Sequence, residues 1–188
     1  MRKIIVSEFL SLDGVMEAPG PSHDFKHAGW TMPFWNEKIA AFKRDELFAG
    51  DALLLGRKTF EGFAAAWPKI KDEQGFAERM NGLPKHVASS ALKDLAWNNS
   101  HALSGPLADS VRAIKSLSGG DILMFGSGKL AGALLQLGLV DELRFLVYPV
   151  VLGSGQRFFE QAPHVTLQTV EARDMDRGVT LLRYVIQN

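Results

Sequence analysis

Two hydrophobic patterns alternate along the first three quarters of the chain. Short apolar runs that end in glycine, proline or serine predict buried strands at residues 3–10, 51–55, 84–88, 97–103, 121–125 and 142–151. Apolar residues three or four positions apart predict helices at residues 35–48, 57–66, 107–114 and 130–137, with a shorter helix ending near residue 82. Residues 15–33 fit neither pattern and are expected to form a long irregular loop.

The last quarter of the chain contains only strand patterns. Residues 165–173 and 179–186 predict a hairpin that turns at residues 176–178. Pro149, inside the preceding strand, predicts that this strand lies at a sheet edge or contains a bulge. Alternating strands and helices followed by strands alone indicate one α/β domain over residues 1–188. Its mixed sheet would be parallel first and antiparallel at the C-terminal end.

The stretch at residues 121–138 joins a buried strand to a helix through two glycines. Gly126-Ser127-Gly128 ends the strand, and leucines at helical spacing follow until Gly138, a typical helix stop. Such a turn leaves unpaired backbone N–H groups at the positive end of the helix dipole, where they can bind a phosphate. The alternative is an ordinary strand-to-helix turn.

Cations near the start of two helices favour the phosphate hypothesis. Lys129 lies in the first turn of its helix, where a positive charge is unfavourable by about 0.3–1 kcal/mol unless an anion is near. The same arrangement occurs at Gly56, where a strand meets a helix that starts with Arg57 and Lys58. The two junctions predict two anion sites, which one molecule with separated phosphates would satisfy.

The composition narrows the class of protein. With 188 residues, 46% hydrophobic and 22% charged, the chain matches an ordinary globular domain. Its formal net charge of +0 gives no general attraction to nucleic acid or an anionic membrane. The absence of cysteine excludes disulfides and thiolate chemistry and fits a reducing cytoplasm, and residues 1–14 predict a first strand rather than a signal peptide. We therefore expect a cytoplasmic protein.

Three other kinds of site fit the sequence less well. His23 and His27 are four residues apart, but no H-E-x-x-H motif accompanies them, so we expect no metal site. Ser127 occupies a strand-to-helix turn without the G-x-S-x-G motif of hydrolases. Gly128-Lys129 is not followed by the Ser or Thr that would hold Mg²⁺ in a P-loop.

A dinucleotide remains, and the local charges indicate which one. A usual NAD site has its glycine-rich loop early and an acid at the end of the next strand. Here the loop comes late and the next strand ends in Tyr148-Pro149. A 2′-phosphate needs cations and hydroxyls, which Arg57, Lys58 and the pair Ser89-Ser90 can supply, although two such serines can also cap the next turn. These residues favour NADPH over NADH.

Four segments together strongly resemble the dihydrofolate-reductase-like superfamily. They are SLDG at 11–14, LLLGRKTFEGF at 53–63, ILMFGSGKL at 122–130 and DELRFLVYPVVLGSGQRFF at 141–159. The resemblance covers nearly the whole chain and is strongest to the branch with the riboflavin-biosynthesis reductase domain, the C-terminal domain of a bifunctional deaminase-reductase. It implies a mixed sheet of about eight strands, helices on both faces, and NADPH bound across the carboxyl edge of the sheet.

The resemblance also implies roles for individual residues. Residues 56–59 and 126–130 would hold the cofactor phosphates, residues 89–90 would lie on the adenosine side, and residues 12–14 would lie near the nicotinamide. The implied cofactor-binding residues are Leu12, Gly14, Gly56, Arg57, Lys58, Thr59, Ser89, Ser90, Gly126, Ser127, Gly128, Lys129 and Leu130.

The substrate side is less closely specified. Dihydrofolate reductases carry an acid in the helix before the G-R-x-T motif, but the alignment places Lys38 there, and Glu37 is about 100° away around a helix. Asp13 and Glu37 are the candidate catalytic proton donors. Aromatic rings at the end of the long loop line the substrate pocket, close the core under the loop, or do both. These candidate substrate-binding residues are Trp30, Phe34 and Trp35.

The sequence thus predicts an NADPH-dependent reductase that transfers a hydride to a small heterocyclic or carbonyl substrate resembling a pterin or a riboflavin precursor. Because the pterin acid is missing, the alternative is an NADPH-binding module or sensor without turnover. The apolar strand at 142–151 and the pair Phe158-Phe159 offer more apolar surface than a sheet edge should expose, and relatives in this branch commonly pair. We therefore expect a homodimer that uses the C-terminal strands.

Overall fold

Strands and helices alternate along the chain, as the hydrophobic pattern predicts. The computed structural model describes residues 1–188 except 22–23, 90, 93–94, 161 and 188. Its strands are β1 Ile4–Ser11, β2 Gly50–Gly56, β3 Lys85–Ala88, β4 Ser100–Ala102, β5 Asp121–Phe125, β6 Glu142–Tyr148, β7 Thr166–Asp174 and β8 Thr180–Gln187. Its α-helices are α1 Glu37–Ala49, α2 Arg57–Ala66, α3 Phe76–Gly82, α4 Leu107–Ser116 and α5 Gly128–Gln136, with 3₁₀ turns η1 Met32–Phe34 and η2 Trp67–Lys69.

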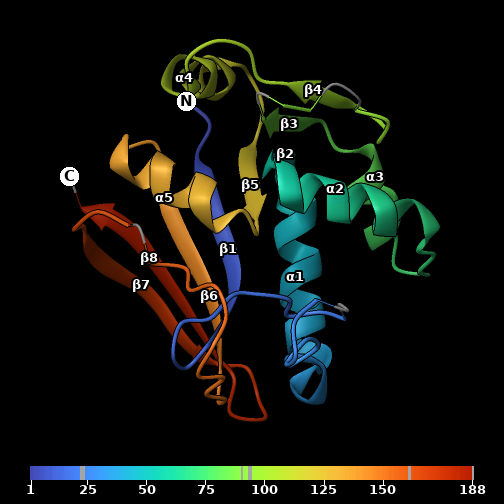
Figure 1. Ribbon diagram of the computed structural model, residues 1–188, viewed down its shortest axis with the longest axis vertical. Coiled ribbons are helices and arrows are strands. Elements are labelled where there is room, and N and C mark those ends of the chain that lie inside the picture. The colour runs from blue at the N-terminus through green and yellow to red at the C-terminus, as the bar shows by residue number, and fades with distance from the viewer. Residues whose placement is uncertain (22–23, 90, 93–94, 161, 188) are drawn as a thin grey trace.

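The strands form one mixed sheet at the centre of the molecule (Figure 1). Their order is β4-β3-β2-β5-β1-β6-β8-β7. Neighbouring strands are parallel from β4 through β6, whereas β8 and β7 add an antiparallel hairpin at one edge. This arrangement confirms the predicted α/β class with antiparallel strands at the C-terminal end.

Helices cover both faces of this sheet (Figure 1). Leu134 of α5 and Val111 of α4 pack with Val6 on one face. Phe60 of α2 packs with Ile5 on the other, together with residues of α1 and α3. Adjacent residues of β1 thus enter opposite cores, because side chains alternate along a strand.

β1 extends beyond its neighbour β5. The last residue of β5, Phe125, is in register with Ser7. β1 continues to Ser11 and is paired there with β6, as far as Tyr148. From Glu8 onward, β1 therefore has no strand partner on the β5 side among the described residues. The sheet opens a gap at the carboxyl ends of its central strands.

The position of β6 corrects one prediction. Pro149 was expected to mark an edge or a bulge, but β6 is an interior strand between β1 and β8. It ends at Tyr148, one residue before the proline, so the missing N–H group breaks no ladder hydrogen bond. The apolar sequence of β6 accordingly reflects burial inside the sheet. The homodimer stays a prediction, and the edge strand available to it is β7.

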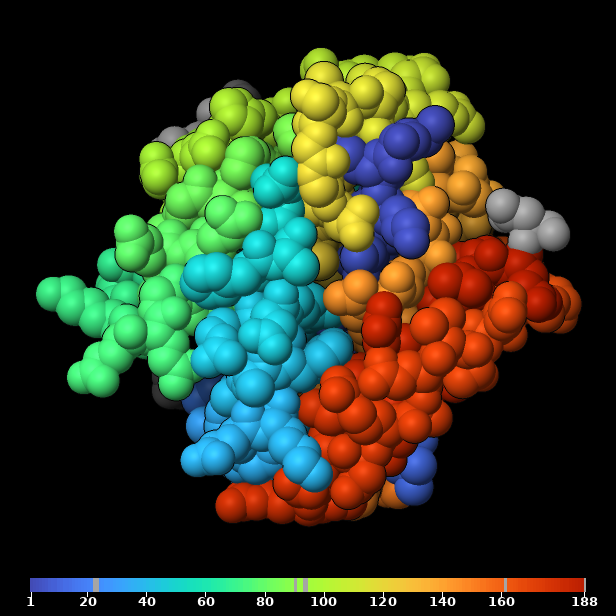
Figure 2. Space-filling model, turned by 180° about the vertical axis from the view of Figure 1, so that it is seen from behind, coloured from blue at the N-terminus to red at the C-terminus, as the bar shows by residue number. Residues whose placement is uncertain are grey.

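The β7–β8 hairpin lies along α1 on the back of the molecule, where Figure 2 shows it in orange and red beside the light-blue helix. A cavity of about 810 Å³ lies between these elements. Its charged lining residues are Lys38, Asp45, Glu46, Arg144, Glu171, Arg173, Asp174 and Arg183.

Gly50, at the start of β2, occupies a position where a side chain does not fit. A Cβ atom there would lie 2.5 Å from Cδ1 of the buried Leu123. Gly50→Ala should therefore lower the free energy of unfolding by about 1–3 kcal/mol, measured by urea denaturation. Gly62→Ala, in α2, meets nothing within 4 Å and should leave stability unchanged or raise it by up to about 1 kcal/mol. Equal stabilities of the two variants would contradict this packing.

Candidate active site

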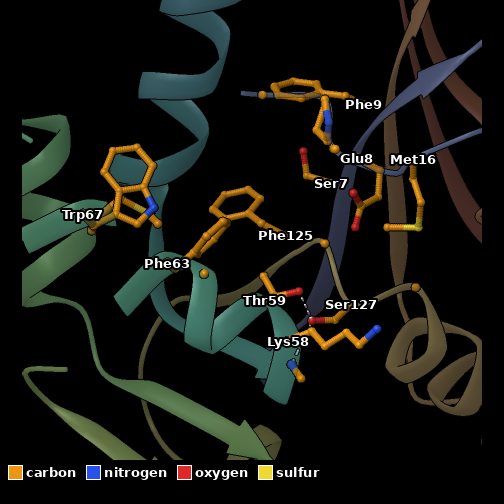
Figure 3. A pocket seen from close by; sticks show the side chains of 18 of the residues that line it. Ser7, Glu8, Phe9, Met16, Lys58, Thr59, Phe63, Trp67, Phe125 and Ser127 are labelled. Carbon is orange, nitrogen blue, oxygen red and sulfur yellow. Dashed lines mark hydrogen bonds between the residues drawn. The ribbon is translucent and has the colours of Figure 1, made fainter. Parts of the chain in front are cut away.

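A cleft with a volume of about 1890 Å³ opens at the carboxyl ends of β1, β2, β3 and β5 (Figure 3). The β2–α2 and β5–α5 junctions, residues 16–21 and aromatic side chains of α2, η2 and α3 line it. Pockets for drug-sized ligands measure about 300–1,000 Å³. The cleft therefore has room for a dinucleotide and a second molecule.

The two glycine junctions contact each other directly. Ser127 Oγ accepts a hydrogen bond from the Gly56 N–H at 2.8 Å and donates one to Thr59 Oγ1 at 2.9 Å. Gly126 and Ser127 both have a φ of 64°, a left-handed backbone that turns the chain sharply into α5. A Cβ atom at Gly126 would lie 2.9 Å from Thr59 Oγ1, so this close approach requires glycine.

Both helices begin without a cap. Within the described residues, no side chain caps α2 or α5, and neither helix has an acidic residue in its first turn. Arg57, Lys58 and Lys129 are exposed beside these N-termini. Arg57 Nε lies 3.9 Å from Glu61 Oε1, a half-exposed contact that contributes little, and the two lysines form no ion pair within the described part of the chain. The site thus offers backbone donors and cations to an anion.

Most of the predicted cofactor-binding residues line this cleft. They are Gly56, Arg57, Lys58, Thr59, Ser89, Gly126, Ser127, Gly128, Lys129 and Leu130. The Ser89 hydroxyl accepts hydrogen bonds from two backbone N–H groups of the next turn, so it acts as a cap. Ser90 lies outside the described residues. Leu12 and Gly14 form the turn after β1 and are not among the lining residues.

The two predicted proton donors are not among the residues that line the cleft. The Asp13 carboxylate accepts hydrogen bonds from Ser11 Oγ at 2.7 Å and from the N–H groups of Leu152 and Gly153 at 3.1 and 2.9 Å. The Ser11 hydroxyl and these backbone groups lower the pKa of Asp13 to about 2. Asp13 thus fastens the turn after β1 to the loop after β6. Glu37 is exposed at the first turn of α1.

The predicted aromatic residues divide between core and cleft. Trp30 is buried, donates from Nε1 to the Glu17 carbonyl and packs edge-on against Tyr148 at 5.3 Å between ring centroids. Phe34 packs against the same tyrosine at 5.8 Å. Trp35 lines the cleft. The other aromatic residues of the wall, which the sequence reasoning did not select, are Phe9, Phe25, Phe63, Trp67, Phe76 and Phe125.

Neither a cluster of metal ligands nor a membrane-spanning helix occurs among the described residues. No three histidine or acidic side chains there are grouped as ligands for a metal ion. None of the helices described is both long and apolar enough to cross a bilayer.

Residues 2–181 of the chain match the family model of the RibD C-terminal domain. The chain belongs to the RibD C-terminal domain family. This confirms the resemblance that the four sequence segments predict. Among curated proteins, the chain is 28% identical over 187 residues to the uncharacterized protein YyaP of Bacillus subtilis (strain 168), covering 97% of this chain and 94% of that protein.

Solved structures share the fold of this RibD C-terminal domain. The diaminohydroxyphosphoribosylaminopyrimidine deaminase/5-amino-6-(5-phosphoribosylamino)uracil reductase of Thermotoga maritima matches with a TM-score of 0.67 at 14% identity, over 99% of this chain and 57% of that one. Dihydrofolate reductase of Enterococcus faecalis, complexed with NADP(H) and RAB-propyl, matches with a TM-score of 0.62 at 14% identity, over 99% and 97%. The fold is therefore that of the dihydrofolate-reductase-like reductases.

Glu8 is a feature of this RibD C-terminal domain that the sequence reasoning missed. It lines the cleft from β1, its side chain is 7% exposed, and its Oε1 atom has no hydrogen-bond partner within the described residues. Burial raises the pKa of Glu8 to about 8, although Lys43 and the Gly126 backbone oppose the rise. The available signal was an acid inside the apolar run 3–10, since buried acids concentrate at functional sites.

Lys43 connects the cleft to a buried polar network. Its ammonium lies 2.8 Å from Ser7 Oγ, 2.5 Å from Glu46 Oε2 and 4.2 Å from the centroid of the Phe125 ring. Ser7 donates to the same Glu46 oxygen at 2.8 Å. The network anchors α1 to β1 beside Glu8 and fixes the position of a cation in the wall of the cleft.

Glu8 should make the stability of the protein depend on pH. The pKa of the Glu8 carboxyl group is 4.5 in the unfolded protein and about 8 in the folded protein. Between these values the unfolded state binds fewer protons, so the free energy of unfolding falls as pH rises, by up to about 1.4 kcal/mol per pH unit for this group. Urea denaturation between about pH 5 and pH 8 should show Glu8→Gln gaining stability over wild type as pH rises. If the difference in the free energy of unfolding between Glu8→Gln and wild type is the same at every pH, the raised pKa of Glu8 is contradicted.

Proposed function

We propose that this protein is an NADPH-dependent reductase that transfers a hydride to a small heterocyclic or carbonyl substrate of the pterin or riboflavin-precursor kind. The observation that carries the proposal is the pair of uncapped helix N-termini, at Gly56 and Ser127, that face one cleft. Arg57, Lys58 and Lys129 flank them without a strong internal partner among the described residues. The pyrophosphate and 2′-phosphate of NADPH carry the charges that these cations would neutralise.

The comparisons support this proposal. The Thermotoga maritima neighbour is a reductase of 5-amino-6-(5-phosphoribosylamino)uracil, and the Enterococcus faecalis neighbour is a reductase complexed with NADP(H). Both likenesses span nearly the whole of this chain. A reduced nicotinamide bound here would supply the hydride.

The protein would position the two reactants. The glycine junctions would hold the phosphates at one end of the cleft, and the aromatic wall would receive a flat ring at the other. In Figure 3, Phe63, Trp67 and Phe125 lie on the opposite side of the cleft from Glu8 and Met16. Rings of this kind pack against an aromatic heterocycle and exclude water from the reacting atoms.

Two measurements test the proposal. Fluorescence titration gives the Kd values of NADPH and NADH, and absorbance then follows NADPH oxidation with candidate substrates. The substrates are 5-amino-6-(5-phosphoribosylamino)uracil, 7,8-dihydropterin and an α-dicarbonyl compound. We expect tighter binding of NADPH than of NADH and oxidation with at least one substrate. Binding without oxidation would favour a cofactor sensor, and absence of binding would contradict both functions.

Arg57→Ala should weaken NADPH binding without harming the apo-protein. The variant loses one charge-assisted contact, so the Kd should rise about tenfold to a hundredfold, which corresponds to about 1.5–3 kcal/mol. Because the cation opposes the dipole of α2, the stability of the apo-protein should stay within about 0.5 kcal/mol of wild type or rise slightly. NADH binding should weaken less if Arg57 contacts the 2′-phosphate, and equally if it contacts the pyrophosphate.

Arg112→Ala is the matched control. Arg112 lies on α4, outside the cleft, with its side chain 59% exposed and 3.6 Å from Asp109. Its removal should change neither the NADPH Kd nor the salt dependence of binding. If Arg57→Ala instead lowers the melting temperature of the apo-protein and leaves the NADPH Kd unchanged, Arg57 is a structural residue and the two-anion-site argument fails.

A further inference from the structure

Glu8 occupies the floor of the cleft at the point where the sheet opens. It is the first residue of β1 beyond the end of β5, and its register partner on β6 is the buried Phe145. Figure 3 shows its carboxyl group between the side chains of Ser7 and Met16. A buried oxygen atom without a partner costs free energy, so this group has a hydrogen-bonding capacity that the fold leaves unused.

The neighbouring charges are already balanced without Glu8. The buried Lys43 is paired with the buried Glu46, which the half-buried Arg144 also contacts. Arg144 and Arg183 both pair with the buried Glu142, and Arg183 pairs with Glu171 as well. Lys43 forms its ion pair with Glu46, and no ion pair to Glu8 occurs among the described residues. β6 presents Phe145 opposite Glu8, and the β5–α5 junction presents the backbone of Gly126. An ionised Glu8 would therefore add a second buried anion beside Lys43, whose ammonium is already paired with Glu46.

No other carboxyl group in the described lining is placed in the same way. The others are Glu17, Asp24, Asp72 and Glu73. Glu17 accepts a hydrogen bond from a backbone N–H at 2.8 Å, and Asp72 accepts one from the Gln74 N–H and two from the first turn of α3. Asp24, Asp72 and Glu73 are exposed to solvent. Glu8 alone in this set is buried.

We infer that Glu8 is the catalytic acid of the proposed reductase: its neutral carboxyl group donates a hydrogen bond to the heteroatom of a C=N or C=O bond and gives that atom a proton as the adjacent carbon receives hydride. The inference rests on the proposed function and replaces Asp13 and Glu37 as proton donors. A general acid must lie within hydrogen-bond reach of the atom that it protonates, and Glu8 meets this condition for a substrate on the cleft floor.

The step is balanced in atoms and electrons. The hydride adds to carbon, and the π electrons of the C=N or C=O bond move to nitrogen or oxygen. That atom takes the proton from Glu8, so the substrate gains two electrons and two hydrogens while the nicotinamide loses two electrons and one hydrogen. Glu8 is left as a carboxylate, which a proton from solvent neutralises before the next cycle.

The role defines a substrate class. A neutral acid stabilises an acceptor whose negative charge develops on nitrogen or oxygen during hydride addition. The substrate should therefore carry an imine-like or carbonyl bond with an available lone pair.

The protonation of Glu8 is measured first, in the protein without cofactor. Infrared spectra of wild type and Glu8→Gln at pH 7 should differ by the carbonyl band of one protonated carboxyl group. In wild type, this band should disappear with a midpoint near pH 8. Glu78→Gln, the same change at an exposed position of α3, should leave the band in place. A Glu8 that is already ionised at pH 7 would overturn the inference.

The second measurement separates cofactor binding from proton donation. Glu8→Gln should bind NADPH with a Kd within about twofold of wild type but oxidise it at least about a hundredfold more slowly with the panel of three substrates. The turnover rate of wild type should fall above about pH 8, whereas the rate of Glu8→Gln should show no such fall. Glu8→Asp, which keeps the acid, should recover part of the rate.

The outcomes distinguish the two proposals. If wild type does not bind NADPH, the proposed function fails. If NADPH binds normally but Glu8→Gln turns over at the wild-type rate, the Glu8 inference fails and the reductase function stands. Absence of turnover by wild type with every substrate of the panel also overturns the role of Glu8 as a proton donor, whatever its state of protonation.

Discussion

The architecture of the cleft depends on the unequal length of two adjacent parallel strands. β5 stops at Phe125 because Gly126 turns the chain into α5, whereas β1 continues because β6 supplies its hydrogen bonds as far as Tyr148. The gap exposes the floor of the sheet at Glu8. It also lets α2 and α5 direct their N-termini into the same space. One constraint on strand length thus creates both the proposed anion-binding end and the proposed reactive end of the cleft.

Burial at this gap has opposite consequences for two neighbouring ionisable groups. Lys43 donates hydrogen bonds to Glu46 and Ser7 at 2.5 and 2.8 Å. Breaking a buried ion pair of this kind costs about 3–5 kcal/mol, so the network holds α1 firmly against the sheet. Glu8 has no such partner for Oε1 within the described residues and is therefore more stable as the neutral acid. Both groups are buried, so the presence or absence of a polar partner is what distinguishes them.

Two acids near the end of β1 illustrate the same principle. The Asp13 carboxylate accepts hydrogen bonds from Ser11 and from the Leu152, Gly153 and Arg157 donors of the loop after β6, which stabilise its charge. Glu8, five residues earlier, is buried, and its Oε1 atom has no hydrogen-bond partner among the described residues. The acid in the SLDG motif therefore holds the turn after β1 in place, whereas the acid within the apolar run 3–10 lines the cleft.

Local sequence determined most of the fold and the anion-binding end of the site. The positions of strands and helices along the chain follow from hydrophobic periodicity, and the junctions at Gly56 and Gly126 follow from glycine and cation placement over a few residues. Such signals are local, because each depends on neighbours along the chain.

Tertiary structure alone decided which acid enters the cleft and where β6 lies. Glu8 is shielded by residues from α1, β6 and the β5–α5 junction, which are far from it in sequence. Pro149 lies just beyond an interior strand because the hairpin pairs with β6 rather than beginning a new edge elsewhere. Burial and strand pairing are properties of contacts between distant segments, so no pattern within a single segment can specify them.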